Sequence, residues 1–222
     1  MTSSNLTAAA AYLAERDAVL APIVAAVGAP ALRRGASLFG ALAGSIVGQQ
    51  LSVKAAAAIR QRLDGLMPNG AGLTPEGILA QSPDDLRAAG LSRAKVAYLT
   101  DLAIRVHDGV VDLETISQLD DEAVIAELVQ VKGIGRWTVE MFLIFALNRL
   151  DVLPVDDLGF RTALKRNYGL DHLPTAGEVR EIARPWEPYR SIGTWYMWQS
   201  LRNEPLREQS AVSSPESERE GS

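Results

Sequence analysis

The 222-residue sequence contains no cysteine. It can therefore form no disulfide bond, and it has no thiolates to hold an iron–sulfur cluster. It also has no apolar run of membrane-spanning length, because arginine, glycine or polar residues interrupt every candidate. The N-terminus lacks the basic region of a signal peptide and carries the acidic residues Glu15 and Asp17 early. These absences argue against secretion and against a membrane span, and we expect a cytoplasmic protein.

Strand patterns are scarce as well. Valine and isoleucine occur mainly inside segments with a helical period, and we find no credible strand. The composition, 47% hydrophobic and 22% charged, is ordinary for a globular protein. The length allows one large domain or two small ones. The sequence therefore predicts an all-α fold.

Positive charge is in short supply, because the formal net charge is −5. The last residues, 203–222, hold five acids against two arginines and are rich in serine, glutamate and proline. We expect them to form a disordered acidic tail. From Lys132 to Arg202 the balance reverses, with ten basic residues against eight acidic ones. The C-terminal part before the tail is therefore mildly basic.

The most informative stretch is residues 128–160. An apolar, helix-patterned segment ends there in a turn at Gly133-Ile134-Gly135, and a second apolar helix begins at Arg136. Two glycines around one aliphatic residue allow a tight turn with positive φ and close backbone approach, and Ile134 would fill the gap between the helices. The N–H groups of Gly133, Gly135 and Arg136 would point out of the new helix and form a cradle for a phosphate. The pattern is that of a helix-hairpin-helix motif.

A second unusual junction lies upstream. A helix predicted to start at Ser37 ends in the residues GQQLS at 48–52, and a glutamine pair is an unusual break in an apolar helix. Ser52 can cap the next helix, from Val53 to Leu66. Further helix starts are predicted at Ser82, Ser92 and the capping box of Thr175 and Glu178.

The hairpin is followed by a carboxylate at Asp157, twenty residues after Trp137, in the sequence PVDDL. This combination resembles the helix-hairpin-helix DNA glycosylase superfamily, and GIGRWT with the acidic pair is most similar to its 3-methyladenine DNA glycosylase II, or AlkA-like, branch. The resemblance covers roughly residues 36–202. It implies two small helical lobes with a cleft between them, preceded by an N-terminal helical segment, residues 1–35. The related bacterial enzyme has an additional α/β domain at its N-terminus, for which this chain is too short.

The resemblance implies a monofunctional DNA glycosylase. Such an enzyme flips an alkylated base of the 3-methyladenine or 7-methylguanine type out of DNA and hydrolyses its N-glycosidic bond, leaving an abasic site. The implied catalytic residue is Asp157, whose carboxylate would stabilise the positive charge that develops on the sugar. By its position alone Asp157 would cap the following helix, and both roles can coexist. Relatives that also cleave the backbone have a lysine at the position of Trp137, and a tryptophan cannot form a Schiff base.

The resemblance also assigns a base pocket and a residue that enters the DNA. Trp137, Met141 and Trp198 would line the pocket, where aromatic faces attract cationic purines. Gln50 would fill the space left by the flipped nucleotide, with Leu51 packed behind it. The residues alone leave a plainer alternative, in which Gln50 is an ordinary loop or capping glutamine.

At the hairpin, the resemblance implies contacts with a DNA phosphate and with a cation. The phosphate-binding residues would be Gly133, Gly135 and Arg136. A structural Na or K ion would be bound by the backbone carbonyls of Val129, Val131 and Ile134, and no other cofactor is implied. Backbone ligands leave no side-chain signature, so the sequence does not test this site.

The expected partner is double-stranded DNA containing alkylated bases, and we expect a monomer. Because the chain is acidic overall, DNA affinity would rest on backbone donors and a few local cations, with a shallow salt dependence. Two alternatives remain. One is a glycosylase of the same superfamily for other damaged bases, although Trp137 argues against the bifunctional kinds. The other is a non-catalytic helix-hairpin-helix DNA-binding module, against which Asp157 and the tryptophans argue.

Overall fold

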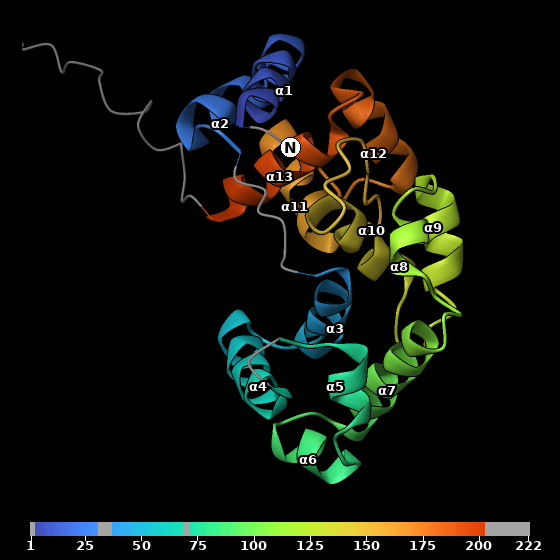
Figure 1. Ribbon diagram of the computed structural model, residues 1–222. Helices are drawn as coiled ribbons and strands as arrows, with labels where there is room; N and C mark the ends of the chain where they lie inside the picture. Colours follow the sequence, from blue (N-terminus) through green and yellow to red (C-terminus); the bar gives the residue numbers. More distant parts are fainter. Residues whose placement is uncertain (1–2, 31–36, 69–71, 203–222) are drawn as a thin grey trace, which may run out of the picture.

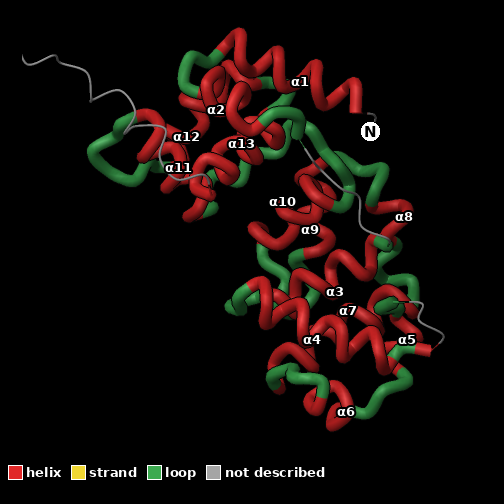
Figure 2. The backbone as a smooth tube through the Cα atoms, turned by 90° about the vertical axis from the view of Figure 1, so that its left-hand side faces the viewer, coloured by secondary structure: helices red, strands yellow, loops and turns green. Residues whose placement is uncertain are grey.

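The structure, a computed structural model, describes residues 3–30, 37–68 and 72–202. Within these ranges it consists of helices and connecting loops without a strand, which confirms the predicted all-α class (Figures 1 and 2). The predicted tail, 203–222, lies outside the described residues. None of the described helices is long and apolar enough to cross a membrane. The elements are α1 (Ser3–Arg16), α2 (Leu20–Val27), α3 (Leu38–Gly48), α4 (Val53–Leu66), α5 (Pro75–Leu79), α6 (Pro83–Ala88), α7 (Arg93–His107), α8 (Leu113–Ile116), α9 (Asp121–Leu128), α10 (Arg136–Phe145), α11 (Leu158–Tyr168), α12 (Ala176–Ala183), the 3-10 helix η2 (Arg184–Trp186) and α13 (Arg190–Arg202).

Short polar side chains set where most of these helices begin. Ser52, Ser82 and Ser92 each accept a hydrogen bond from the backbone N–H three residues later, as predicted. Thr175 and Glu178 form the predicted reciprocal capping box at the start of α12. Each cap satisfies N–H groups that have no acceptor within the helix.

The first lobe contains α3 to α9 and the buried face of α10. Phe39, Leu42 and Ile46 of α3 point into its core at the helical spacing read from the sequence, and Phe142 and Leu143 of α10 join them. Burial of each such side chain contributes about 1.5–3 kcal/mol relative to exposure. The same burial leaves the opposite face of α10 turned away from the first lobe.

The second lobe joins the two ends of the described chain, because α1 and α2 pack with α11, α12 and α13 (Figure 1). The carboxylate of Asp17 links these segments. It accepts hydrogen bonds from Trp186 Nε1 at 2.7 Å, from the backbone N–H groups of Val19 and Leu20, and from the hydroxyl of Tyr168. The N-terminal helical segment is therefore built into the second core through a buried polar network.

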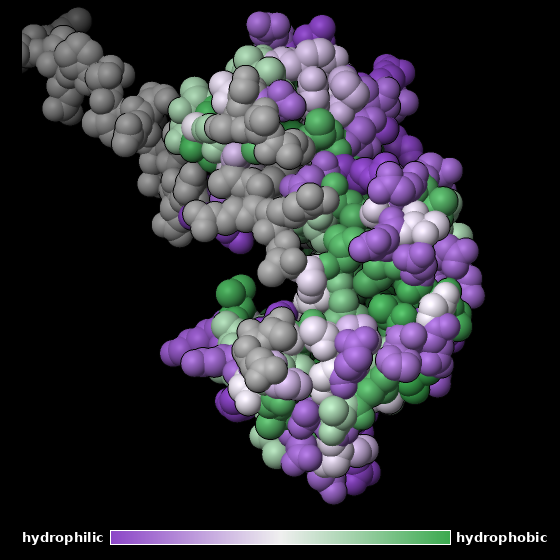
Figure 3. Space-filling model, in the orientation of Figure 1, coloured by the Kyte–Doolittle hydropathy of each residue, from purple (hydrophilic) through white to green (hydrophobic). Residues whose placement is uncertain are grey.

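One loop, residues 146–157, connects α10 to α11 and is fixed to the start of α13. Asp151 accepts two hydrogen bonds from the Arg190 guanidinium, at 2.9 and 2.7 Å, and Ser191 Oγ accepts the N–H of Val152 at 2.9 Å. The surface is hollowed between the two lobes (Figure 3). This arrangement turns the outer face of α10 toward the first turn of α11 and toward α13.

Candidate active site

Asp157 stands where α11 begins and serves as its N-cap. Its Oδ1 accepts the backbone N–H of Phe160 at 2.6 Å, so the capping prediction is confirmed. The side chain is half-buried. A cap of this kind fixes both the backbone and the carboxylate at the helix start.

Two tryptophans hold the same carboxylate from the other side. Trp137 Nε1 of α10 donates to Oδ2 at 2.7 Å, and Trp198 Nε1 of α13 donates to Oδ1 at 2.9 Å. Three elements, α10, α11 and α13, thus meet at Asp157, and three N–H donors fix the direction of its two oxygens. The structure brings together the three residues that the sequence analysis singled out here.

A cavity of about 400 Å³ opens beside Asp157. Trp137, Met141 and Phe145 line it from one face of α10, where they follow one another at four-residue spacing. The Phe145 ring stacks on Trp198 with centroids 5.8 Å apart and an angle of 25° between the planes. Phe145 is not among the predicted pocket residues, although the four-residue spacing from Trp137 through Met141 points directly to it.

A second cavity, of about 660 Å³, adjoins the first because Trp137 and Met141 line both. Its other walls come from two turns. One is the corner between α3 and α4, residues 48–52, called the α3–α4 corner below, and the other is the hairpin, residues 129–135. We refer to these two adjoining cavities together as the groove; their walls include the carboxylate, the aromatic face of α10 and both turns.

Gln50 lies at the tip of the α3–α4 corner with an exposed side chain and a φ of 57°. Positive φ is uncommon for a residue other than glycine, and here it turns the chain sharply between two helices. Leu51, which follows it, is 39% exposed. Both residues line the second cavity together with Gln49, whose side chain turns toward the hairpin.

The two glycines of the hairpin differ in what they require. Gly133 has a φ of 78°, and a Cβ on it would lie 2.2 Å from the ring of Tyr98, so both the conformation and the space demand glycine. Gly135 has a φ of −102°, and a Cβ there would meet nothing within 4 Å. The positive φ that the glycine pair allows is therefore adopted by Gly133, whereas Gly135 is extended and acts as the N-cap of α10. Ile134 between them is buried, as predicted.

The start of α10 has no side-chain cap. Its first N–H groups lack acceptors within the helix, and Gly135, Trp137 and Thr138 line the second cavity. Open space at the Gly135 Cα and uncapped donors together make a site that an anion can approach closely.

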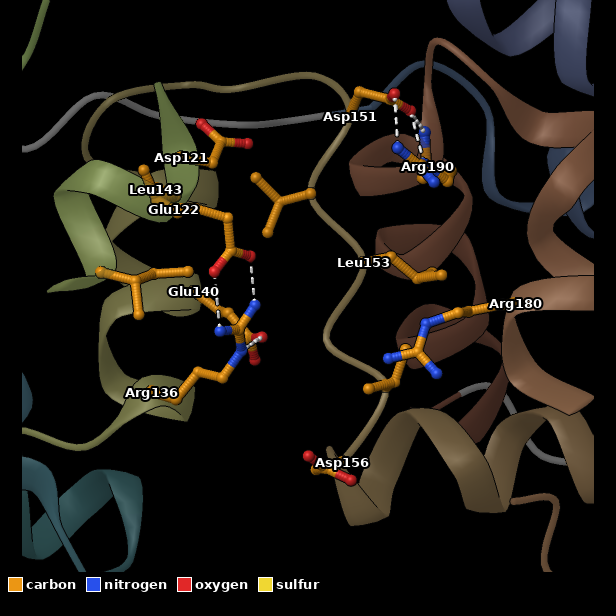
Figure 4. A pocket seen from close by; sticks show the side chains of 13 residues that line it. Asp121, Glu122, Arg136, Glu140, Leu143, Asp151, Leu153, Asp156, Arg180 and Arg190 are labelled. Carbon is orange, nitrogen blue, oxygen red and sulfur yellow. Dashed lines mark hydrogen bonds and ion pairs between the residues drawn. The ribbon is translucent and has the colours of Figure 1, made fainter. Parts of the chain in front are cut away.

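The Arg136 side chain points away from this groove, into a separate polar cavity of about 460 Å³ (Figure 4). Its Nη1 donates to Glu122 of α9 at 3.0 Å, its Nη2 also contacts Glu122, and its Nε donates to Glu140 at 3.1 Å. The Glu122 hydrogen bonds raise the pKa of Arg136, so the charge is permanent and paired. The Arg136 guanidinium is therefore engaged with Glu122 and Glu140 on the side of the polar cavity and does not line the groove.

Two lysines near the groove are also engaged within the protein. Lys95 Nζ donates to the carbonyls of Val47 and Gln49 at 2.8 and 2.7 Å, and burial lowers its pKa. Lys132 lies 3.6 Å from a carboxylate oxygen of Asp101. These two lysines thus help to hold the corner and the hairpin in place.

The carbonyls of Val129, Val131 and Ile134 belong to the turn between α9 and α10. The Val131 carbonyl accepts the N–H of Ile134 at 3.1 Å, and both side chains are buried, while Val129 is 41% exposed. Among the described residues no group of three or more His, Cys, Asp or Glu side chains could hold a metal. A cation here would therefore be bound by uncharged backbone oxygens, a donor set that suits a hard ion of low charge.

Comparison with known proteins gives a consistent result. Residues 43–188 match the model of the HhH-GPD superfamily of base excision DNA repair proteins. The chain is 38% identical over 159 residues to DNA-3-methyladenine glycosylase 1 of Schizosaccharomyces pombe, covering 71% of this chain and 70% of that protein. It is 33% identical over 127 residues to a putative DNA-3-methyladenine glycosylase of Bacillus subtilis, covering 57% of this chain and 44% of that protein. Its structure superposes on a Schizosaccharomyces pombe 3-methyladenine DNA glycosylase in complex with abasic DNA with a TM-score of 0.81 and 35% identity, over 89% of this chain and 98% of the other.

Proposed function

This chain belongs to the HhH-GPD superfamily of base excision DNA repair proteins, and we propose that within it the chain is a monofunctional DNA glycosylase for alkylated bases. Its substrate is double-stranded DNA with lesions of the 3-methyladenine or 7-methylguanine type. Its products are the free base and an abasic site. The names of its relatives, and the abasic DNA bound by its structural neighbour, support this assignment. We further propose that it acts as a monomer, while the cytoplasmic location stays a prediction.

One observation carries the proposal: Asp157 faces a groove with both oxygens held by indole N–H groups of Trp137 and Trp198. Cleavage of an N-glycosidic bond develops positive charge on the sugar, and a fixed negative charge lowers that barrier. In the proposed reaction the carboxylate lies against the sugar of the flipped nucleotide and orients a water molecule. The water oxygen bonds to C1′ and gives up a proton through the carboxylate. The electron pair of the broken bond leaves with the base.

The cavity beside Asp157 accounts for the choice of base in this proposal. The aromatic faces of Trp137, Phe145 and Trp198 offer π density to a purine that carries positive charge after alkylation. Met141 adds a flexible apolar wall. Because no lysine stands at position 137, the enzyme forms no Schiff base and leaves the DNA backbone uncut.

The groove also accounts for how DNA is held. The N–H groups at Gly133, Gly135 and Arg136 bind a backbone phosphate, and Gln50 enters the duplex at the vacated position with Leu51 behind it. The paired guanidinium of Arg136 takes no part in this contact.

A structural Na or K ion at the hairpin is a further part of the proposal. The carbonyls of Val129, Val131 and Ile134 would hold it, and the ion would strengthen the turn and its positive field toward a phosphate. Replacing KCl with tetramethylammonium chloride should lower the melting temperature and weaken binding to abasic DNA. Equal melting temperatures and affinities in the two salts would contradict the site.

The test of the proposed function is base release from DNA methylated with radiolabelled dimethyl sulfate. The released bases are identified by chromatography, and 3-methyladenine and 7-methylguanine are expected. The DNA strand should remain intact until it is treated with alkali, and borohydride should trap no covalent adduct. Binding without release of any base would instead support a non-catalytic DNA-binding module, and release of other damaged bases alone would change the substrate class.

A further inference from the structure

A polar bridge joins the α3–α4 corner to the hairpin. The side-chain amide of Gln49 donates from Nε2 to the carbonyl of Gly133 at 2.8 Å, across 84 residues of sequence. The carbonyls of Gln49 and Val47 accept the Lys95 ammonium at 2.7 and 2.8 Å. Gln49 therefore contacts the hairpin through its side chain and α7 through its backbone, immediately before Gln50.

One face of α7 supports both turns. Lys95, Tyr98 and Asp101 follow at three-residue spacing and so lie along one side of the helix. Lys95 binds the corner, the Tyr98 ring packs against Gly133, and Asp101 accepts the backbone N–H of Lys132 at 3.0 Å. The hairpin and the corner thus rest on the same rigid element.

This support explains how Gln50 keeps its unusual backbone. A residue other than glycine stays at a φ of 57° only where its surroundings hold it there. The Lys95 bonds fix the two carbonyls that precede it, and the N–H of Leu51 closes the turn onto the Gly48 carbonyl at 3.1 Å. The half-buried ammonium at the end of α3 is also favoured by the helix dipole.

We propose that Gln49 and Lys95 are positioning residues that couple the phosphate contact at the hairpin to the entry of Gln50 into the duplex. The inference rests on the proposed function and deepens it. Neither residue touches the reacting atoms. When the hairpin binds a phosphate, the bridge sets the height and direction of the corner, so Gln50 enters at the nucleotide adjoining that phosphate.

The decisive probe is a duplex with a tetrahydrofuran abasic analogue and 2-aminopurine as its neighbour. It has no base to excise, so its fluorescence reports entry of Gln50 independently of catalysis, while anisotropy reports binding. Gln49→Met removes the amide donor and keeps the length of the side chain. Lys95→Met removes the ammonium. Lys54→Met, at an exposed lysine in the first turn of α4, is the control for loss of a charge near the corner.

We expect Gln49→Met to bind the probe within about twofold of wild type and to lose most of the 2-aminopurine response. Its single-turnover base release should fall about 2- to 10-fold, the effect of one neutral hydrogen bond. The loss should be greater for a paired lesion than for a mispaired one, since opening a mispair costs less. Lys95→Met should show the same pattern more strongly, and Lys54→Met should leave the fluorescence response intact.

A wild-type response and rate for Gln49→Met would overturn the inference. So would equal losses of affinity and of rate, because the bridge would then serve only the phosphate contact. Melting temperatures show whether each variant is folded. If Lys95→Met unfolds, the Gln49→Met variant alone tests the coupling, because Gln49 is partly exposed and its replacement should leave the fold intact. If wild type releases no base but its 2-aminopurine response depends on Gln49, the proposed function fails while the coupling stands.

Discussion

Asp157 shows how one side chain serves both the fold and the chemistry. Its Oδ1 is shared between the N–H of Phe160, which makes it a cap, and the indole of Trp198, while Oδ2 is held by Trp137 alone. The helix start therefore fixes the position of the carboxylate, and the tryptophans fix its direction. Such preorganisation is what an electrostatic contribution to catalysis requires, because no reorganisation is needed as charge develops.

Replacement of Asp157 by asparagine separates these roles. Asparagine caps a helix about as well as aspartate. Its NH₂ group, however, cannot accept the hydrogen bond that an indole N–H donates to the second carboxylate oxygen of Asp157. We expect Asp157→Asn to lower the single-turnover rate of base release by about 10²–10³-fold, with binding to abasic DNA changed little. The cost in stability should be about 1 kcal/mol, the value of one hydrogen bond.

The neighbouring Asp156 provides the matched control. It is exposed and lines the polar cavity on the far side of α10 (Figure 4). Asp156→Asn should therefore keep nearly full activity. Full base release by Asp157→Asn would reduce that residue to a cap and remove the main support for the proposed mechanism.

The hairpin glycines give a second prediction at the residue scale. Gly133→Ala should lower stability by roughly 1–3 kcal/mol, because alanine is strained at the positive φ of this position and its Cβ would clash with the ring of Tyr98. Gly135→Ser should keep or raise stability, since serine is a better N-cap and its Cβ meets open space. It should nevertheless weaken DNA binding, because the side chain occupies the approach to the N–H groups. Chemical denaturation and anisotropy measure the two effects, and wild-type DNA affinity for Gly135→Ser would show that no phosphate approaches there.

At the scale of elements, α10 divides two functions between its faces. One face carries Trp137, Met141 and Phe145 into the groove, and the other places Arg136 and Glu140 in the polar cavity (Figure 4). Arg136 joins α10 to Glu122 of α9 and so braces the two helices on either side of the hairpin. Glu140 is only 4% exposed, and this burial raises its pKa even beside the guanidinium.

The variant Glu140→Gln tests how much the buried carboxylate lowers the stability of the folded protein. Between the ordinary carboxyl pKa and the raised pKa of Glu140, the folded protein holds a proton that the unfolded chain has released, so stability falls as pH rises. We compare the free energy of unfolding of wild type with that of Glu140→Gln. The difference should favour wild type most below the ordinary carboxyl pKa and should decline as pH rises through the raised pKa of Glu140 in the folded protein. Denaturant unfolding of both proteins across this range measures the difference. A difference that grows with pH would mean that the ion pair with Arg136 outweighs the burial.

Sequence patterns predicted the elements well, because their causes are local. The caps at Ser52, Ser82 and Ser92 depend on residues within one turn. The hairpin was likewise readable from two glycines and the change of helix. Partners across the fold are not readable in this way. No residue near Lys95 in the sequence points to its partners, the carbonyls of Gln49 and Val47, which lie 46 and 48 residues away. The direction of the Arg136 side chain depended in the same way on Glu122.

At the scale of the whole molecule, the groove lies where two separate cores meet. The face of α10 with Phe142 and Leu143 is buried in the first core, and Trp198 packs against both. The N-terminal helices complete the second core through Asp17 and Trp186. No local pattern in residues 1–35 predicted that contact, because its other half lies near the far end of the chain.

The charge distribution of the molecule leads to a prediction about DNA affinity. The net charge is −5. Two of the cations near the groove are paired with carboxylates, Arg136 with two glutamates and Lys132 with Asp101, while Arg202 lines the cavity beside Asp157. Lys95 is bound to backbone carbonyls. The phosphate contacts proposed at the hairpin are backbone N–H groups, which carry no net charge and would replace few condensed counterions.

The affinity for abasic duplex DNA should therefore depend weakly on salt. A protein that neutralises Z phosphates shows a slope of about −0.9Z in log affinity against log salt concentration, and six to ten phosphate contacts reduce affinity by about 10³–10⁵ between 50 and 200 mM salt. Here we expect a slope no steeper than about −3, or a loss of less than about 100-fold over that range. Anisotropy titrations in KCl measure it, with Lys54→Met as a variant that removes one exposed cation and should flatten the slope by about 1 only if that lysine contacts a phosphate. A slope of about −6 or steeper would mean that binding opens the internal ion pairs, Arg136 with Glu122 first, and turns their cations toward DNA.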